Sequence, residues 1–262
     1  IVKCGIIDAQ KQPTAEAFDD CVNEAYKAYR RCYRTGLMRL LRGEATESAT
    51  EEFKVRFCYG QQTRIHFIGV WDTVDAVGLP FHVSDLINAV IYRFKFPNQK
   101  LSEQVDHAYH ALAVDDDRHS FHPLLWDQRA SNPGKLQKIE QVWFAGAHAN
   151  VGGGYPKQGL SLTAMHWLMT KAANVGLRFI PGEYEYYRDR ANVDDKLYDP
   201  RAGLGVFYRW KPRDIGQLCH DNGVTPAIHL SVMERIAHGT EDYSPGNLPP
   251  DGRVVITPNG DQ

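Results

Sequence analysis

The sequence predicts an α/β fold, in which helices cover a mostly parallel β-sheet. Segments 65–70 and 141–147 are short and apolar and show little alternation with polar residues, so both faces of each strand are expected to be buried. Helical patterns lie before, between and after these strands. The strands lead into Asp72 and His148, at the carboxyl ends where open α/β sheets bind their ligands.

One long helix is expected before the first of these strands. Thr14 follows Pro13 and can cap this helix, whose apolar residues recur at helical spacing from Phe18 to Leu40. Its acidic residues come early and its basic residues late, as the helix dipole favours. The polar segment 43–52 is expected to be a loop, and segment 53–59 a further strand.

Two helices are expected between the strands. Segment 81–96 is interpreted as a core helix ended by Pro97, with a cap over a lipid-binding cleft as the alternative. The second helix begins at Ser102 and extends to about Leu112. The acidic run Asp115–Asp117 that follows is expected to be a solvated turn.

The remainder of the chain holds shorter elements. After the glycine run 152–154, a helix opens at Ser161 and is closed near Gly176. Segment 205–210 is interpreted as a strand. A second helix begins with a capping box at 231–234.

No boundary between domains is evident, so residues 1–262 are predicted to form a single domain. Proline and glycine recur in segment 244–250, and residues 244–262 are expected to form an extended tail.

Composition narrows the functional classes. The 262 residues include 30 basic and 32 acidic side chains, a balance that argues against a nucleic-acid-binding protein. The five cysteines are scattered, without the spacing of a zinc site, and fit thiols in a reducing compartment. No apolar run approaches the roughly 20 residues that span a bilayer, and no signal-peptide pattern begins the sequence. A soluble protein folded in the cytoplasm is expected.

Asp72 and His148 suit the acid and the base of a catalytic triad. A buried carboxylate fixes the tautomer of an imidazole, whose other nitrogen then takes a proton from a nucleophile. In α/β-hydrolases the nucleophile precedes the acid in the chain, but the only serine before Asp72 is Ser48, which has no glycine beside it to form the strained elbow. The sequence thus supplies two of the three residues.

Three motifs carry a family resemblance. They are Gly69-Val70-Trp71-Asp72-Thr73-Val74, then His110-Ala111-Leu112-Ala113 followed by Phe121, Pro123 and Trp126, and lastly Val142-Trp143-Phe144-Ala145-Gly146-Ala147-His148 with Val151-Gly152-Gly153-Gly154-Tyr155. Together they resemble the catalytic domain of the class-one type VI secretion lipase effectors, which are α/β-hydrolases of the phospholipase type. The resemblance runs in matching order from Ile1 to about Pro249.

The resemblance implies an α/β-hydrolase-like fold and a role for each matching residue. Asp72 would be the triad acid and His148 the triad base. The residues expected beside the substrate cleft are Trp71, Thr73, His110, Gly152, Gly153 and Gly154. Asn150 departs from the family, which usually has aspartate at that position.

The family's serine lies in a Gly-Phe-Ser-Arg-Gly-Ala elbow, ahead of a Cys-Gly pair that Cys4-Gly5 resembles here. The elbow and the first strands of the sheet are therefore expected upstream of Ile1, so that the chain is the C-terminal part of a serine ester hydrolase and inactive alone.

The resemblance also implies the surroundings in which the protein works. The substrate would be a lipid or another ester, and the secretion apparatus or an immunity protein would be partners. The protein would leave the producing cell's cytoplasm for a target cell by a route that uses no signal peptide. Neither a cofactor nor a metal is expected.

Alternatives remain open from the residues alone. Asp75 competes with Asp72 as the acid, and His229 with His148 as the base. His107 and His110 lie three residues apart and would share one face of a helix, as zinc ligands can. A non-catalytic module that binds a lipid or a protein on a degenerate hydrolase shell is the second functional hypothesis.

Overall fold

The computed structural model describes residues 3–31, 47–60, 63–74, 101–129, 137–203 and 208–258. These residues form five strands, seven α-helices and three short 3-10 helices. In chain order the elements are η1 (Ala9–Lys11), α1 (Ala15–Arg31), α3 (Glu47–Phe57), β1 (Ile65–Trp71), β2 (Val105–Ala113), η2 (His119–Phe121), β3 (Lys138–Phe144), α5 (His148–Gly152), α6 (Gly159–Ala173), α7 (Glu183–Arg190), α8 (Ile215–Asp221), β4 (Ala227–His229), α9 (Leu230–His238), η4 (Thr240–Asp242) and β5 (Arg253–Val255).

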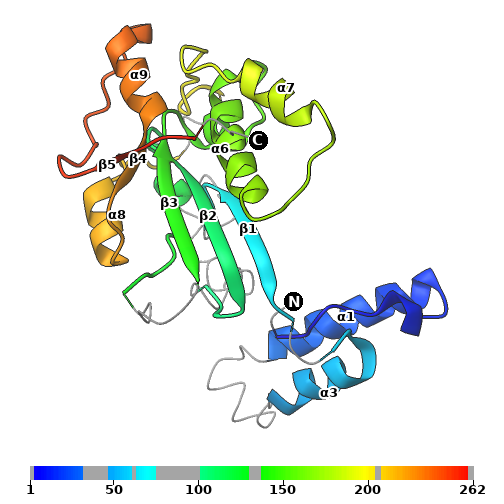
Figure 1. Ribbon diagram of the computed structural model, residues 1–262. Coiled ribbons are helices and arrows are strands. Elements are labelled where there is room, and N and C mark those ends of the chain that lie inside the picture. The colour runs from blue at the N-terminus through cyan, green and yellow to red at the C-terminus, as the bar shows by residue number, and fades with distance from the viewer. Residues whose placement is uncertain are drawn as a thin grey trace. The chain divides into compact units, whose positions relative to one another are not determined.

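The strands form one sheet with the order β1-β2-β3-β4-β5, so that neighbours in the sequence are neighbours in space. The pairs that β3 makes with β2 and β4, and that β4 makes with β5, are all parallel. Figure 1 shows β1 and β5 at opposite edges of this sheet. A parallel sheet covered by helices confirms the predicted fold class.

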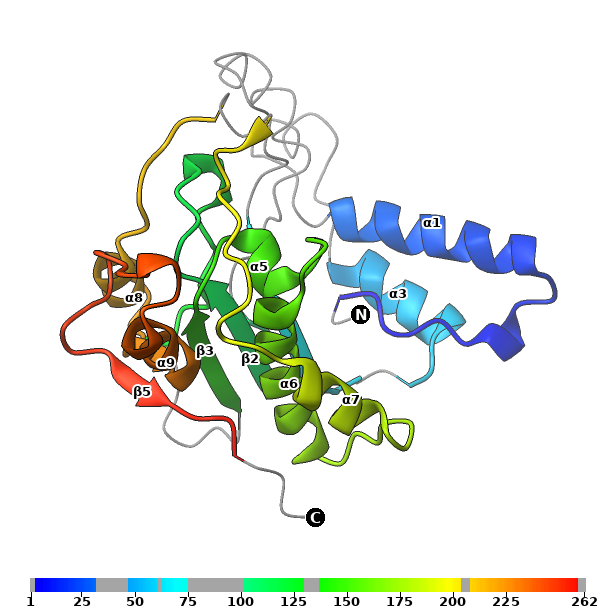
Figure 2. The ribbon, with the colours of Figure 1, turned by 90° about the horizontal axis from the view of Figure 1, so that it is seen from above.

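Helices cover both faces of the sheet (Figure 2). Alternate residues of a strand point to opposite faces, and the core accordingly divides in two. Tyr109 and Ala111 of β2 pack with Trp167 of α6, and Leu112 of β2 packs on the other face with Ile215 of α8. This division explains why successive residues of these strands are apolar, such as Ala111 and Leu112 of β2 and Val142 and Trp143 of β3.

Contacts along the chain divide it into two compact units. Unit 1 contains residues 1–66 and 102–106, and unit 2 contains residues 67–101 and 107–262. In unit 1, helices α1 and α3 pack around a small core that includes Cys21, Phe53 and Cys58. The prediction of one domain over the whole chain stays a prediction.

Several sequence expectations match these elements. Thr14 caps α1, because its Oγ1 accepts a hydrogen bond from the backbone N–H of Ala17 at 3.1 Å. The predicted strands at 65–70 and 141–147 are β1 and β3, with β3 beginning and ending three residues earlier. The helix expected to open at Ser161 is α6, which starts at Gly159.

Three element predictions are wrong. Segment 43–52, expected to be a loop, includes residues 47–52 of helix α3. Segment 53–59, expected to be a strand, is mostly the end of helix α3, where Phe53, Phe57 and Cys58 pack in the core of unit 1. The helix expected from Ser102 to Leu112 is instead strand β2, because a central position in the sheet buries nearly all of its side chains. The predicted helix at 81–96 and most of the predicted strand at 205–210 lie outside the described residues.

The C-terminal elements also differ in detail from the predictions. The cap of α9 is His229, whose Nδ1 accepts a hydrogen bond from the N–H of Ser231, so the predicted capping box is wrong. Within residues 244–262, expected to be an extended tail, the structure contains β5, which pairs with β4 at the sheet edge. Among the described residues, no helix is long and apolar enough to cross a membrane.

Candidate active site

Asp72 and His148 meet at the carboxyl ends of β1 and β3. Asp72 follows the last residue of β1, and His148 is the first residue of α5, four positions after the end of β3. The Nδ1 atom of His148 lies 2.8 Å from Oδ2 of Asp72. Asp72 is fully buried, whereas about a third of the His148 side chain (32%) is exposed. The structure thus brings together the two residues proposed as acid and base, and their catalytic roles stay a prediction.

Arg213 is a second partner of the Asp72 carboxylate. Its Nη1 and Nη2 atoms donate hydrogen bonds to Oδ1 and Oδ2 of Asp72 at 2.6 and 2.8 Å. The same guanidinium donates to the carbonyl oxygens of Ala113 and Phe121, both at 2.5 Å. Arg213 is itself fully buried, so this two-pronged ion pair is shielded from solvent.

This ion pair keeps Asp72 ionised inside the protein. Burial alone would raise the pKa of Asp72, but the Arg213 guanidinium and the hydrogen bond from His148 together lower that pKa well below its usual range. The N–H of Ala113 adds a further hydrogen bond to Oδ1, at 2.9 Å. A carboxylate that stays charged can orient His148 and stabilise its protonated form.

Sequence reasoning did not identify Arg213. It lies in an aperiodic stretch, 141 residues after Asp72, and nothing in its neighbourhood marks it as a partner of the acid. The sequence shows only that Arg213 is a basic residue. That it is buried beside an acid becomes clear only in the tertiary structure.

The backbone around His148 is held by two further aspartates. Asp115 Oδ2 accepts a hydrogen bond from the N–H of Gly146 at 2.6 Å, and Asp116 Oδ2 accepts one from the N–H of His148 at 3.0 Å. Asp116 is fully buried and forms a salt bridge with Arg118 at 2.6 Å. The expectation of a solvated turn at Asp115–Asp117 is wrong, because Asp116 is buried. Its carboxylate instead binds the N–H of His148, the first residue of α5.

Asn150 completes the turn that presents His148. Its Oδ1 accepts a hydrogen bond from the N–H of Ala147 at 3.3 Å, and its Nδ2 donates to the carbonyl oxygen of Lys196 at 3.2 Å. Gly146 has a φ of 108°, and a Cβ there would lie only 2.3 Å from the Cβ of Asn150. Glycine is therefore required at this position for two reasons, its backbone conformation and the closeness of Asn150.

His110 supports the other side of the site. It is fully buried in β2, and its Nε2 accepts a hydrogen bond from the N–H of Thr73 at 3.1 Å. Burial lowers the pKa of His110 to about 4, so the ring is neutral near pH 7 and Nε2 can act as an acceptor. His110 thus fixes the backbone that follows Asp72.

Trp71 and the glycine run lie near each other at the rim of the site. A Cβ on Gly152 would lie 3.7 Å from the Cβ of Trp71, whose side chain is exposed. Gly153 and Gly154 have φ values of 90° and 114°, in the region that favours glycine. Thr73 is exposed as well. Trp71, Thr73, Gly152 and Gly154 are thus exposed, whereas His110 is buried, and the place of these residues beside a substrate stays a prediction.

The structure also bears on the alternative zinc site at His107 and His110. His107 and His110 lie on strand β2 and not on a helix, so side chains three residues apart point to opposite faces of the sheet. In the described part of the chain, no group of three or more His, Cys, Asp or Glu side chains is placed to hold a metal ion. Asp75 lies outside the described residues.

Comparison with known protein families gives one match. The family model for the T6SS phospholipase effector Tle1-like catalytic domain matches residues 1–171 of the chain. The matched segment includes both Asp72 and His148, whereas Arg213 follows it. No curated protein and no solved structure matches the chain.

Proposed function

The chain belongs to the Tle1-like family of T6SS phospholipase effectors, and we propose on that premise that Asp72 and His148 are the acid and base of a Ser-His-Asp triad. The reaction would be the hydrolysis of an acyl ester of a phospholipid. The effector family also supports a site of action in a target cell, with the secretion apparatus or an immunity protein as partners.

The contact between His148 and the buried Asp72 carries this proposal. Because Nδ1 of His148 faces the carboxylate at 2.8 Å, the proton on that atom is fixed and Nε2 becomes the acceptor. Nε2 would take the proton of the serine hydroxyl as the serine oxygen attacks the acyl carbonyl carbon. The protonated imidazole would then give this proton to the departing alcohol oxygen, and water would release the fatty acid in a second round.

The nucleophile is not assigned to a residue of the described segments. Ser48 lies within helix α3, and a nucleophile elbow requires a sharp turn between a strand and a helix. The backbone amides that would hold the oxyanion are also unassigned. The two residues proposed here are therefore the proton-relay part of the triad, and without a serine they would not cleave an ester.

A fluorophosphonate probe tests the proposal in the full-length protein. Such a probe reacts with a serine only when the serine is activated by its base, so labelling is expected in the wild type and should be lost in His148→Ala. The matched control is His220→Ala, since the side chain of His220 is 85% exposed and lies 3.7 Å from Asp221.

Wild-type protein that hydrolyses no phospholipid and takes up no probe would contradict the proposal. Binding to phospholipid vesicles without hydrolysis would then favour the lipid-binding module over the enzyme.

A further inference from the structure

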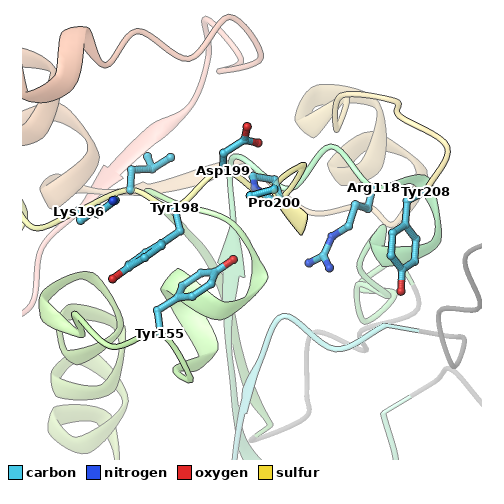
Figure 3. A pocket seen from close by; sticks show the side chains of 9 residues that line it. Arg118, Tyr155, Lys196, Tyr198, Asp199, Pro200 and Tyr208 are labelled. Atoms are coloured by element: carbon cyan, nitrogen blue, oxygen red, sulfur yellow. The ribbon is translucent and has the colours of Figure 1, made fainter. Parts of the chain in front are cut away.

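A cavity of about 540 Å³ opens in unit 2, near the candidate active site. Its residues come from the segment after β2, from the loop after α5 and from the long segment after α7. They include Arg118, Tyr155, Lys196, Tyr198, Asp199 and Tyr208, shown in Figure 3. We call it the tyrosine cavity, because three tyrosines form much of its wall.

Arg118 is the cation best placed in this cavity. Its Nε and Nη2 atoms donate to Asp116 at 3.0 and 2.6 Å, which fixes the guanidinium group in one orientation. Among the described residues, no hydrogen bond is found from its Nη1. In Figure 3 the guanidinium points into the space between Tyr155 and Tyr208. A fixed guanidinium with N–H groups to spare is suited to an oxyanion such as phosphate.

Lys196 provides a second cation, and the one carboxylate in the wall is turned aside. Lys196 is exposed, and its Nζ lies 5.2 Å from the centre of the Tyr198 ring. Asp199 uses its Oδ1 to accept a hydrogen bond from the N–H of Arg201 at 2.8 Å. In the view of Figure 3 its carboxylate points away from the tyrosine rings. The cavity therefore offers two cations to an anionic group.

The tyrosine cavity is joined to the candidate active site by Phe121. The ring of Phe121 contacts the His148 imidazole edge-on, at a centroid distance of 5.3 Å, and contacts Tyr208 at 5.6 Å. The Arg118 guanidinium lies 3.6 Å from the centre of the same ring. One aromatic ring thus separates the proposed base from the cation of the cavity.

From this arrangement we infer that the tyrosine cavity binds the phosphodiester of a phospholipid headgroup while an acyl ester of the same lipid faces His148. The inference rests on the proposed function. In a glycerophospholipid only a few atoms of the glycerol backbone separate an ester from the phosphate, which suits two sites separated by one ring. The volume falls within the range of roughly 300–1,000 Å³ typical of small-molecule sites, enough for a headgroup and not only for a phosphate ion.

Binding of a soluble headgroup tests the cavity without relying on catalysis. The probe is glycerophosphoethanolamine, titrated into the full-length protein by calorimetry, with inorganic phosphate and glycerol in parallel titrations. Lys196→Gln should weaken binding of the diester about tenfold, the effect of losing one charge-assisted hydrogen bond. The matched control is Lys157→Gln, which removes an exposed lysine that does not line the cavity, and binding should not change.

Hydrolysis of two substrates with the same acyl chains then tests whether the cavity serves the active site. For phospholipid vesicles, Lys196→Gln should raise KM about tenfold with little change in kcat. For diacylglycerol, which has the esters without the phosphate, neither constant should change. Arg118→Lys keeps a charge beside Asp116 but loses the planar fork, so the preference for phospholipid over diacylglycerol should fall.

Three results would overturn the inference. Inorganic phosphate that binds as tightly as the diester would make the cavity a site for free anions. Equal losses on both substrates in Lys196→Gln would show that the residue acts through folding. Binding of the diester that Lys196→Gln and Arg118→Lys both leave unchanged would place the headgroup elsewhere. Failure of the proposed function can be told apart from failure of this inference. In the first case the wild type would hydrolyse neither substrate, and the diester titration would still show whether the cavity binds a headgroup.

Discussion

Two histidines near the ends of neighbouring strands, His148 after β3 and His229 in β4, show how environment decides what an imidazole can do. His148 follows β3 and faces a buried carboxylate, while its side chain is partly open to solvent. His229 ends β4, is buried against the ring of Phe144, and contacts the hydroxyl groups of Ser231 and Thr257, each at 2.8 Å. The first imidazole lies beside a carboxylate and the second is buried beside two hydroxyl groups.

The pKa of His229 reflects this difference. Burial, with smaller contributions from His166 and Lys171, lowers it to about 4, so His229 is neutral at pH 7 and caps α9 in that form. A general base must be able to hold the proton it takes. The comparison therefore favours His148 over His229 as the base, although both are histidines near a strand end.

The largest expected effect comes from removing each histidine in turn. His148→Gln should lower the rate of phospholipid hydrolysis by about a thousandfold or more, since loss of the proposed base would remove both proton transfers. His229→Gln should leave kcat within a few fold. The measurement is fatty-acid release by the full-length protein. A larger loss in His229→Gln than in His148→Gln, at equal folded fraction, would reverse the assignment.

Removing the cation behind Asp72 should have the next largest effect. Arg213→Met leaves a buried carboxylate without its partner, which is expected to lower the free energy of unfolding by about 3–5 kcal/mol. Denaturant unfolding measures it. Asp72→Asn combined with Arg213→Met should be more stable than Arg213→Met alone, because the unpaired charge is gone.

An exposed ion pair is the matched control for Arg213. Arg129 donates to Asp127 at 2.8 Å, but its side chain is 62% exposed. Arg129→Met is expected to cost less than about 1 kcal/mol. Similar losses for Arg213→Met and Arg129→Met would mean that the Asp72 carboxylate is not held as a buried charge.

The neutral histidines should make stability depend on pH. His110 and His229 have pKa values of about 4 in the folded protein against an ordinary value of 6.5. Between these values the unfolded chain binds more protons than the folded one, so the free energy of unfolding falls as pH falls from 6.5 to 4. Each histidine contributes a slope of up to about 1.4 kcal/mol per pH unit. Asp72, with its lowered pKa, adds a loss only below about pH 4.

Urea unfolding at several pH values from 7.5 to 4.5 measures this slope. His229→Gln should flatten it, whereas His220→Gln, which removes an exposed histidine, should not. An unchanged slope in His229→Gln would indicate that His229 is charged in the folded protein, and would weaken the contrast with His148.

Two glycines near His148 give the smallest of the expected effects. Gly146→Ala combines an unfavourable φ of 108° with a contact of 2.3 Å to Asn150, and should cost more than about 2 kcal/mol. Gly154→Ala has a φ of 114° with open space around it, so only the backbone penalty of about 1–2 kcal/mol is expected. Thermal unfolding compares the two variants. Equal costs would show that Asn150 yields to the new methyl group.

The candidate site was partly predictable. Asp72 and His148 were visible because both follow apolar strands whose ends must meet at one edge of a parallel sheet. Arg213 and Asp116 were not, because each acts through a partner far away in the sequence and neither lies in a periodic segment. The strand β2 was mistaken for a helix, since its apolar spacing in a central strand carries no period of two.

The sequence by itself determined the class of fold, the family and the two polar residues at strand ends. These features depend on local hydrophobicity and on motifs that are continuous in the chain. Tertiary structure alone decided that the buried Arg213 lies beside the buried Asp72, and that Asp116 binds the N–H of His148. Tertiary structure also decided that His148 lies beside a carboxylate and is partly exposed, whereas His229 is buried. The physical reason is that a pKa depends on burial and on neighbouring charges, and both are set by residues that the fold brings from distant parts of the chain.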